Sequence, residues 1–166
     1  MFVKLEDFFS AKECREWISW AEQRQPDRIT AIGEHMTRQH YTVESPQLEQ
    51  AVEEIVQRIV QRPIWWNGAG QLFEDPPGWI IEEHRDTSPN MCVNFQVYLT
   101  GGVPTLGTVA RINGAQVLAE YAPGSGYVLV DPHKISHGMI KPVPPGHVRW
   151  SYYASWRFTE QAEEIW

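Results

Sequence analysis

A chain of 166 residues is long enough for one hydrophobic core and too short for a second domain of ordinary size. Its hydrophobic content of 42% excludes intrinsic disorder, and no apolar run approaches the roughly 20 residues of a membrane span. The formal net charge of −7 argues against a nucleic-acid-binding surface, although a local basic groove stays open. Two cysteines give no disulfide framework and the N-terminal segment is not a secretory signal, so we expect a cytoplasmic protein.

The first part of the chain, residues 1–70, is expected to be a helical support region. Ser10 and Glu13 have the spacing of a capping box, and apolar residues follow at helical spacing. Ser45 followed by Pro46 is typical of a second helix start, and another amphipathic pattern follows it. We expect both helices to pack on the outside of a sheet.

Between the two helical patterns, Ile29–Val43 alternates polar and apolar residues. Met36, Arg38, His40 and Thr42 would share one face of such a strand. The ordinary interpretation of a polar face is contact with solvent. The functional alternative is that Arg38 or His40 points at a substrate.

Residues 71–158 have the pattern of a strand-rich core. Short strand patterns between Gly, Pro and Asn-Gly turns cover Gln71–Glu74, Val93–Leu99, Thr105–Ile112, Ala115–Tyr121, Tyr127–Asp131 and Val148–Trp156. Many short strands after two helices predict a mainly β jelly roll with both helices on one sheet. Residues 1–166 would then form a single domain, followed only by a short helical or frayed tail over Thr159–Trp166.

Three side chains in this core could bind one metal ion. His84 and Asp86 are two apart, so on a strand they point to the same side. His137 would complete a set of two histidines and one carboxylate, which leaves one face of an octahedral Fe(II) open for a co-substrate and O₂. A His-x-Asp triplet also arises by chance, and HRD occurs in protein kinases, but no Gly-rich loop or DFG accompanies it. His133 is a competing ligand, although its Pro-bounded loop favours a surface position.

Arg149 follows His137 by twelve residues, across a Pro-rich turn. A two-strand hairpin about this turn would bring Arg149 back beside His137. Its guanidinium could there pair with a carboxylate through two hydrogen bonds. Ser151 and Tyr153 share its face of the strand.

The strand Val93–Leu99 has an apolar face and a polar face, which carries Asn94, Gln96 and Tyr98. Such alternation usually means that one face is packed and the other is in solvent. In a small closed barrel, however, a polar inner face indicates a site. Trp79 is a candidate for the mouth of that site, with an ordinary core position as the alternative.

Taken together, these motifs resemble those of the Fe(II)- and 2-oxoglutarate-dependent dioxygenases, in particular the prolyl-hydroxylase-like branch. The residues that match the family's ligand pattern are His84, Asp86, His137, Arg149 and Ser151, and PGWIIEEHRD resembles the run that leads into its His-x-Asp motif. The resemblance implies a double-stranded β-helix, a cupin-like jelly roll. It also implies that Tyr98, with Arg149 and Ser151, binds the distal carboxylate of 2-oxoglutarate. Ile81 departs from the family pattern, because many relatives have Tyr there.

The resemblance further implies a hydroxylase that uses Fe(II), 2-oxoglutarate and O₂, with ascorbate as a candidate reductant, and releases succinate and CO₂. Its substrate would be a small molecule, an amino acid or a peptidyl residue, contacted by residues such as Arg38, His40, Trp79, Asn94 and Gln96. A carboxylate at Asp86 favours hydroxylation over halogenation. Two other classes stay open: a metal-dependent jelly-roll enzyme that does not need Arg149, and a non-catalytic ligand-binding jelly roll.

Overall fold

The structure is a computed structural model that describes residues 1–32, 36–88 and 91–159. In chain order its elements are β1 (Phe2–Leu5), α1 (Ala11–Glu22), β2 (Arg28–Ile32), β3 (Met36–Val43), α2 (Pro46–Val60), β4 (Ile64–Trp66), β5 (Gly70–Asp75), β6 (Val93–Tyr98), the 3-10 helix η1 (Pro104–Leu106), β7 (Thr108–Ile112), β8 (Ala115–Leu118), β9 (Gly126–Val130), β10 (Ser136–Met139) and β11 (Arg149–Phe158). The tail predicted over Thr159–Trp166 lies outside the described residues except for Thr159. No helix in the described ranges is both long and apolar enough to cross a membrane.

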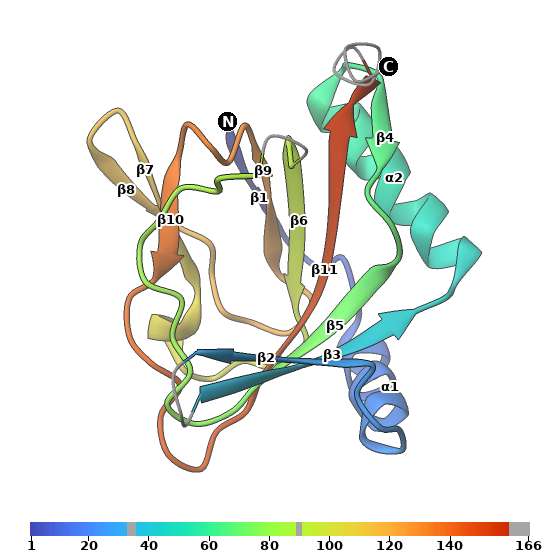
Figure 1. The fold of residues 1–166 in the computed structure, drawn as a ribbon, viewed down its shortest axis with the longest axis vertical. Helices are drawn as coiled ribbons and strands as arrows, with labels where there is room; N and C mark the ends of the chain where they lie inside the picture. Colours follow the sequence, from blue (N-terminus) through green and yellow to red (C-terminus); the bar gives the residue numbers. More distant parts are fainter. Residues whose placement is uncertain (33–35, 89–90, 160–166) are drawn as a thin grey trace.

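Two antiparallel sheets make up most of the molecule. The larger sheet has the order β1-β9-β6-β11-β5-β3-β2, and β4 pairs with the end of β11. The smaller sheet has the order β10-β7-β8. Figure 1 shows the smaller sheet opposite the middle of the larger one, with α2 on the far side of the larger sheet. The predicted mainly β architecture with two helices is confirmed, and it is consistent with a jelly roll.

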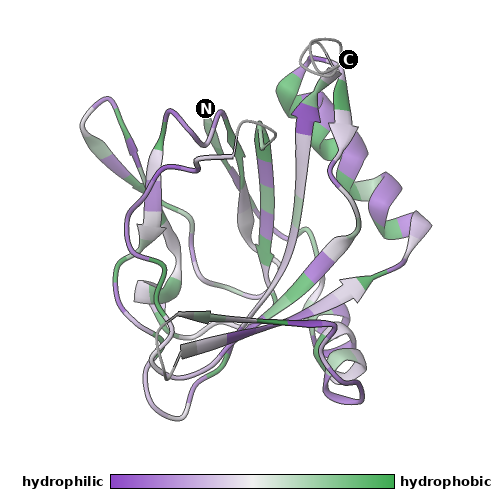
Figure 2. Cartoon of the chain, in the orientation of Figure 1, coloured by the Kyte–Doolittle hydropathy of each residue, from purple (hydrophilic) through white to green (hydrophobic). Residues whose placement is uncertain are grey.

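The main hydrophobic core lies between the helices and the larger sheet. Along β11, Trp150, Tyr152 and Ala154 face this core, together with Val52 and Val56 of α2. The same alternation runs along β6 and is visible as green and purple bands in Figure 2. Because side chains alternate across a strand, the other face of both strands points toward the smaller sheet.

A second apolar cluster lies between the two sheets. It includes Tyr98, Leu106, Ala110 and Leu129, all fully buried, and Trp79, which is 2% exposed. This cluster fills part of the space between the sheets with apolar side chains. A polar pocket occupies another part of that space.

Both helix starts follow the local signals in the sequence. The Ser10 hydroxyl accepts a hydrogen bond from the Glu13 amide, and the Glu13 carboxylate accepts one from the Ser10 amide at 2.8 Å. At α2, Ser45 caps the first turn and Pro46 opens it. The helix ends at Val60, where the next residue adopts a left-handed conformation with φ of 55°.

The hairpin predicted around Asn113-Gly114 is confirmed as β7 and β8. Asn113 and Gly114 have φ angles of 50° and 82°, as a two-residue turn with positive φ at both central positions requires. The stretch Ile29–Val43, in contrast, is not one strand. It forms the pair β2 and β3, in which Arg28 lies opposite His40. Polar and apolar residues alternate through both strands, so this pattern alone did not show that the chain reverses direction between them.

The predicted hairpin between the strands of His137 and Arg149 is wrong. β10 pairs with β7, whereas β11 pairs with β4, β5 and β6. The large aromatic residues on one face of β11 pack against the helices, which places this strand in the larger sheet. His137 and Arg149 therefore come from opposite sheets rather than from neighbouring strands.

Candidate metal centre and pocket

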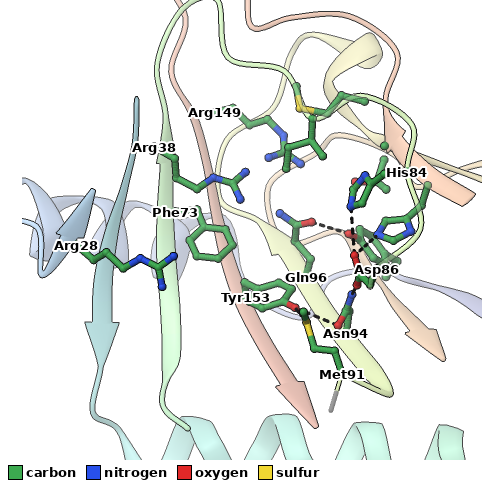
Figure 3. Close-up of a pocket in the computed structure, with 16 residues that line it drawn as sticks. Arg28, Arg38, Phe73, His84, Asp86, Met91, Asn94, Gln96, Arg149 and Tyr153 are labelled. Carbon is green, nitrogen blue, oxygen red and sulfur yellow. Dashed lines mark hydrogen bonds and ion pairs between the residues drawn. The ribbon is translucent and has the colours of Figure 1, made fainter. Parts of the chain in front are cut away.

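A pocket of about 340 Å³ lies between the two sheets, and both sheets contribute to its lining. Figure 3 shows His84 and Asp86 on one side of it and Arg38 and Arg149 on the other. A volume near 300 Å³ is at the small end of ligand-binding pockets. The pocket can therefore accommodate a small acid together with part of another molecule.

The three predicted metal ligands meet at one side of this pocket. The Nε2 atom of His84 lies 3.2 Å from Asp86 Oδ1, and the Nε2 atom of His137 lies 3.7 Å from the same oxygen. All three donor atoms lie within 4.8 Å of one another, and no other such group of three His, Cys, Asp or Glu side chains is found among the described residues. His133 is exposed and is not part of the group.

Backbone pairing brings the two histidines together. His84 and His137 form an isolated antiparallel bridge, with N–H···O distances of 2.9 and 2.8 Å. The segment that carries His84 is thus tied to β10 at this one bridge, and it is not a regular strand. A Cβ atom on Gly138 would lie 2.8 Å from the backbone of Glu82 and Glu83, so the close approach needs a glycine there.

The hydrogen bonds of the two imidazoles fix their tautomers. His84 Nδ1 lies 2.8 Å from the carbonyl oxygen of Glu82, and His137 Nδ1 lies 3.0 Å from that of Ile135. A carbonyl oxygen only accepts, so each Nδ1 carries a proton. In the neutral rings each Nε2 then has a free lone pair directed at Asp86. Backbone carbonyls that orient ligating histidines in this way are common around metal ions.

Asp86 is oriented by a chain of polar groups. Asn94 donates a hydrogen bond to Asp86 Oδ2 at 2.7 Å, and the Tyr153 hydroxyl donates to Asn94 Oδ1 at 3.0 Å. Oδ1 is left to face the histidines. Burial acts to raise the pKa of Asp86, but its interactions with the His84 ring and the Asn94 amide outweigh burial, and the pKa is lowered. Asp86 is therefore a carboxylate near neutral pH.

The two histidines respond differently to this environment. The hydrogen bond to Asp86 raises the pKa of His84, whereas burial lowers the pKa of His137. Two nitrogen lone pairs and a carboxylate oxygen that converge at these distances need a cation between them, either a proton or a metal ion. Two His and one Asp with room on the open side fit a divalent ion such as Fe(II).

Arg149 lies in the same pocket and is 1% exposed. Its Nε donates to the carbonyl oxygen of Leu106 at 3.1 Å, and its Nη1 donates to Asp75 Oδ2 at 2.6 Å. Burial acts to lower the pKa of Arg149, but the Asp75 carboxylate outweighs it and the pKa is raised. The guanidinium is thus a permanent cation that borders the pocket.

The two other predicted co-substrate residues lie behind the pocket wall. Tyr98 is fully buried, and its hydroxyl donates a hydrogen bond to the Thr108 hydroxyl at 2.9 Å. Thr108 borders the pocket. Ser151 accepts a hydrogen bond from Gln96 at 2.8 Å, and Tyr127 donates to the same Gln96. Each predicted residue thus fixes a neighbour that faces the pocket.

The predicted substrate residues fall into two groups. Arg38, Asn94 and Gln96 border the pocket. His40 does not border it, and its ring makes hydrogen bonds with Thr30 and Gln71 instead. Trp79 packs under the Arg38 guanidinium, 4.9 Å away. The solvent-exposed face expected around Arg38 and His40 is also wrong, since both are more than nine-tenths buried.

Sequence reasoning missed Asp75, which is fully buried and binds both pocket arginines. It stands before Pro76-Pro77-Gly78, and the predicted strand over Gln71–Glu74 ends one residue before it. The structure extends β5 by one residue to include it. Asp75 is two residues after Phe73, which borders the pocket, and side chains two apart on a strand point to the same face. This spacing is the signal that could have placed the Asp75 side chain on the pocket face.

Comparisons with known proteins identify the fold. No family model matches the sequence, and a comparison with curated proteins found no significant match. Among solved structures, the chain has the fold of the 2-oxoglutarate- and Fe(II)-dependent oxygenases, prolyl hydroxylases among them. The expected resemblance to the prolyl-hydroxylase-like branch is confirmed at the level of the fold.

Three solved structures illustrate this likeness. A prolyl hydroxylase from Trichoplax adhaerens, in complex with a peptide fragment of a hypoxia-inducible factor, is 12% identical with a TM-score of 0.76, over 99% of this chain and 87% of that one. HygX from Streptomyces hygroscopicus, with nickel, 2-oxoglutarate and hygromycin B bound, is 13% identical with a TM-score of 0.70, over 95% and 83%. The carbocyclase SnoK from nogalamycin biosynthesis is 12% identical with a TM-score of 0.74, over 95% and 79%.

Proposed function

We propose that this protein is an Fe(II)- and 2-oxoglutarate-dependent dioxygenase with a double-stranded β-helix core. It would hydroxylate an unactivated C–H bond and release succinate and CO₂. The observation that carries this proposal is the convergence of His84, Asp86 and His137 within 4.8 Å in a pocket that Arg149 also borders. The fold of known oxygenases of this kind supports it.

The protein's own residues would prepare the site in three ways. The protons on Nδ1 of His84 and His137 keep both Nε2 atoms available as ligands, and Asn94 turns one oxygen of Asp86 toward them. Arg149 would bind the distal carboxylate of 2-oxoglutarate, with Thr108 and Gln96 held in place by Tyr98 and Ser151. The co-substrate would then lie across the pocket, with its 2-oxo acid end toward the three ligands.

Bound Fe(II) would supply the oxygen activation that couples decarboxylation of 2-oxoglutarate to oxidation of the substrate. Apolar side chains that border the pocket, such as Ile81 and Met139, would limit the access of water. Asp86 provides a carboxylate where halogenating relatives have a small residue, which supports hydroxylation as the outcome. The peptide fragment and the hygromycin B bound by the structural neighbours support a short peptide or a small molecule as substrate.

An anaerobic titration with Fe(II) and 2-oxoglutarate tests this function directly. A 2-oxo acid chelated to Fe(II) gives a weak visible charge-transfer band, and we expect this band with the wild-type protein. It should be lost in Asp86→Ala and weakened in Arg149→Gln, while His133→Ala, at an exposed histidine outside the group, should behave as wild type. Metal binding without the band would favour a different metal-dependent enzyme. Failure to bind metal would favour a non-catalytic domain and overturn the proposal.

A further inference from the structure

Arg38, Asp75 and Arg149 form one buried ionic cluster beside the pocket. Arg38 binds both oxygens of Asp75, with Nε to Oδ1 at 2.6 Å and Nη2 to Oδ2 at 2.9 Å. Arg149 Nη1 binds the same Oδ2 at 2.6 Å. Because two guanidinium groups share one oxygen, they lie side by side, and both border the pocket (Figure 3).

The charges in this cluster do not balance. Two cations face one carboxylate, and the exposed fractions are 8% for Arg38, 1% for Arg149 and zero for Asp75. A buried charge without a partner is costly, because little water is present to solvate it. One negative charge supplied by a ligand would bring the cluster to neutrality.

Unused hydrogen-bond donors remain on both arginines. Arg38 uses Nε and Nη2 for Asp75, and Arg149 uses Nε for Leu106 and Nη1 for Asp75. The remaining nitrogen of each guanidinium, Nη1 of Arg38 and Nη2 of Arg149, makes no hydrogen bond with any side chain or backbone group of the described ranges. Arg38 is also restrained by two rings, 4.3 Å from Phe73 and 4.9 Å from Trp79. The cluster is thus preorganised to accept an anion.

We propose that Arg38 and Arg149 together bind the distal carboxylate of 2-oxoglutarate, and that Asp75 is the positioning residue that aligns them. Asp75 also cancels one of their two positive charges, so the cluster matches a ligand group with a single negative charge. This proposal rests on the proposed function and assigns to Arg38 a role in recognition of the co-substrate. It predicts strong discrimination against a 2-oxo acid of the same length without the distal carboxylate.

The test compares 2-oxoglutarate with 2-oxopentanoate, which has a methyl group in place of that carboxylate. Both would be titrated by calorimetry into the Ni(II)-loaded protein, so that turnover plays no part. Arg38→Gln should weaken 2-oxoglutarate binding about ten- to hundredfold, as expected for loss of a charged hydrogen-bonding partner. Binding of 2-oxopentanoate should change little, so the ratio of the two dissociation constants falls. The variant keeps Asp75 paired with Arg149, so we expect it to fold.

Arg28→Gln is the matched control. Arg28 also borders the pocket, but it is exposed and its Nη2 donates a hydrogen bond to Thr30 at 3.4 Å. Its substitution should leave both dissociation constants unchanged. If Arg38→Gln discriminates as well as wild type does, or if Arg28→Gln loses as much, the assignment of Arg38 is overturned.

The role of Asp75 is tested in the double variant Arg38→Gln/Asp75→Asn. This variant restores the single positive charge of the cluster, so discrimination should recover relative to Arg38→Gln. Further loss in the double variant would overturn the charge role of Asp75 and would leave only its alignment of Arg149. If the wild-type protein binds Ni(II) but no 2-oxoglutarate, the proposed function itself fails. That outcome is distinct from wild-type binding that is insensitive to Arg38.

Discussion

At the side of the pocket with the three candidate metal ligands, Asn94 is the residue that donates a hydrogen bond to Asp86 and orients it. Its amide donates to Asp86 Oδ2 at 2.7 Å and leaves Oδ1 to face both histidines. We expect Asn94→Ala to weaken binding of Fe(II) about 10- to 100-fold, the usual effect of removing a group that orients a metal ligand. Anaerobic titration with Fe(II) measures this affinity.

Tyr153→Phe provides a graded comparison for Asn94→Ala. It removes only the hydroxyl that bonds Asn94, so it should cause a smaller loss of metal affinity. Equal affinity in Asn94→Ala and wild type would show that Asp86 is oriented without Asn94.

Several residues of the site could be predicted from the sequence, whereas the partners of Asp75 could not. His84 and Asp86 are two residues apart, and the ligand pattern that His137 completes can be recognised in the amino-acid sequence. Asp75 meets its partners across 37 positions to Arg38 and 74 positions to Arg149. Such contacts depend on the order of strands in the sheet, which no local pattern contains.

Among the elements, β10 depends on Gly138 for its position. A Cβ at this residue would lie 2.8 Å from backbone atoms of Glu82 and Glu83, so no side-chain rotation can relieve the contact. Gly138→Ala should therefore separate His84 from His137 and weaken metal binding by at least about tenfold, an effect comparable to losing an orienting group. Calorimetric titration with Ni(II) measures it.

Ser136→Ala is the control for this substitution. Ser136 lies on the same strand, and its hydroxyl bonds Glu83 at 2.7 Å in an exposed position. Its removal should leave metal affinity near that of wild type. If Gly138→Ala binds metal as tightly as Ser136→Ala, the backbone bridge is not what holds the two histidines together.

Helix starts and tight turns that depend on neighbouring residues could be predicted from the sequence. The partner of each strand in a sheet could not. The Ser10 capping box and the Asn113-Gly114 turn follow from residues within four positions of one another. The Pro-rich segment before Arg149 has the same local features as a hairpin turn, but it connects two different sheets. Turn residues indicate that the chain bends, and they do not specify which strand it pairs with next.

At the scale of the molecule, α2 stabilises the larger sheet by covering its outer face. Val52 and Val56 are fully buried in the core formed with this sheet. Val56→Ala should lower the free energy of unfolding by about 2 kcal/mol, from the lost methyl groups and the cavity they leave. Urea denaturation measures this change.

Glu53→Ala tests whether burial is the cause. Glu53 lies on the exposed face of the same helix, so its substitution should change stability by less than about 0.5 kcal/mol. Metal affinity of folded Val56→Ala should stay at the wild-type level, because α2 does not border the pocket. Equal destabilisation by both substitutions would mean that α2 does not contribute to the core as described.

The position of β11 in the larger sheet has a consequence for the timing of folding. This strand comes after β5 and β6 in the sequence, yet it pairs with both and joins the two halves of the sheet. Until residue 149 and those after it emerge from the ribosome, β5 and β6 each present an unpaired edge, which is prone to association with other chains. Arg149 is the first residue of β11, so the proposed anchor of the co-substrate arrives with the strand that closes the sheet. A nascent chain would therefore complete the proposed co-substrate site only when its aggregation-prone edges are covered.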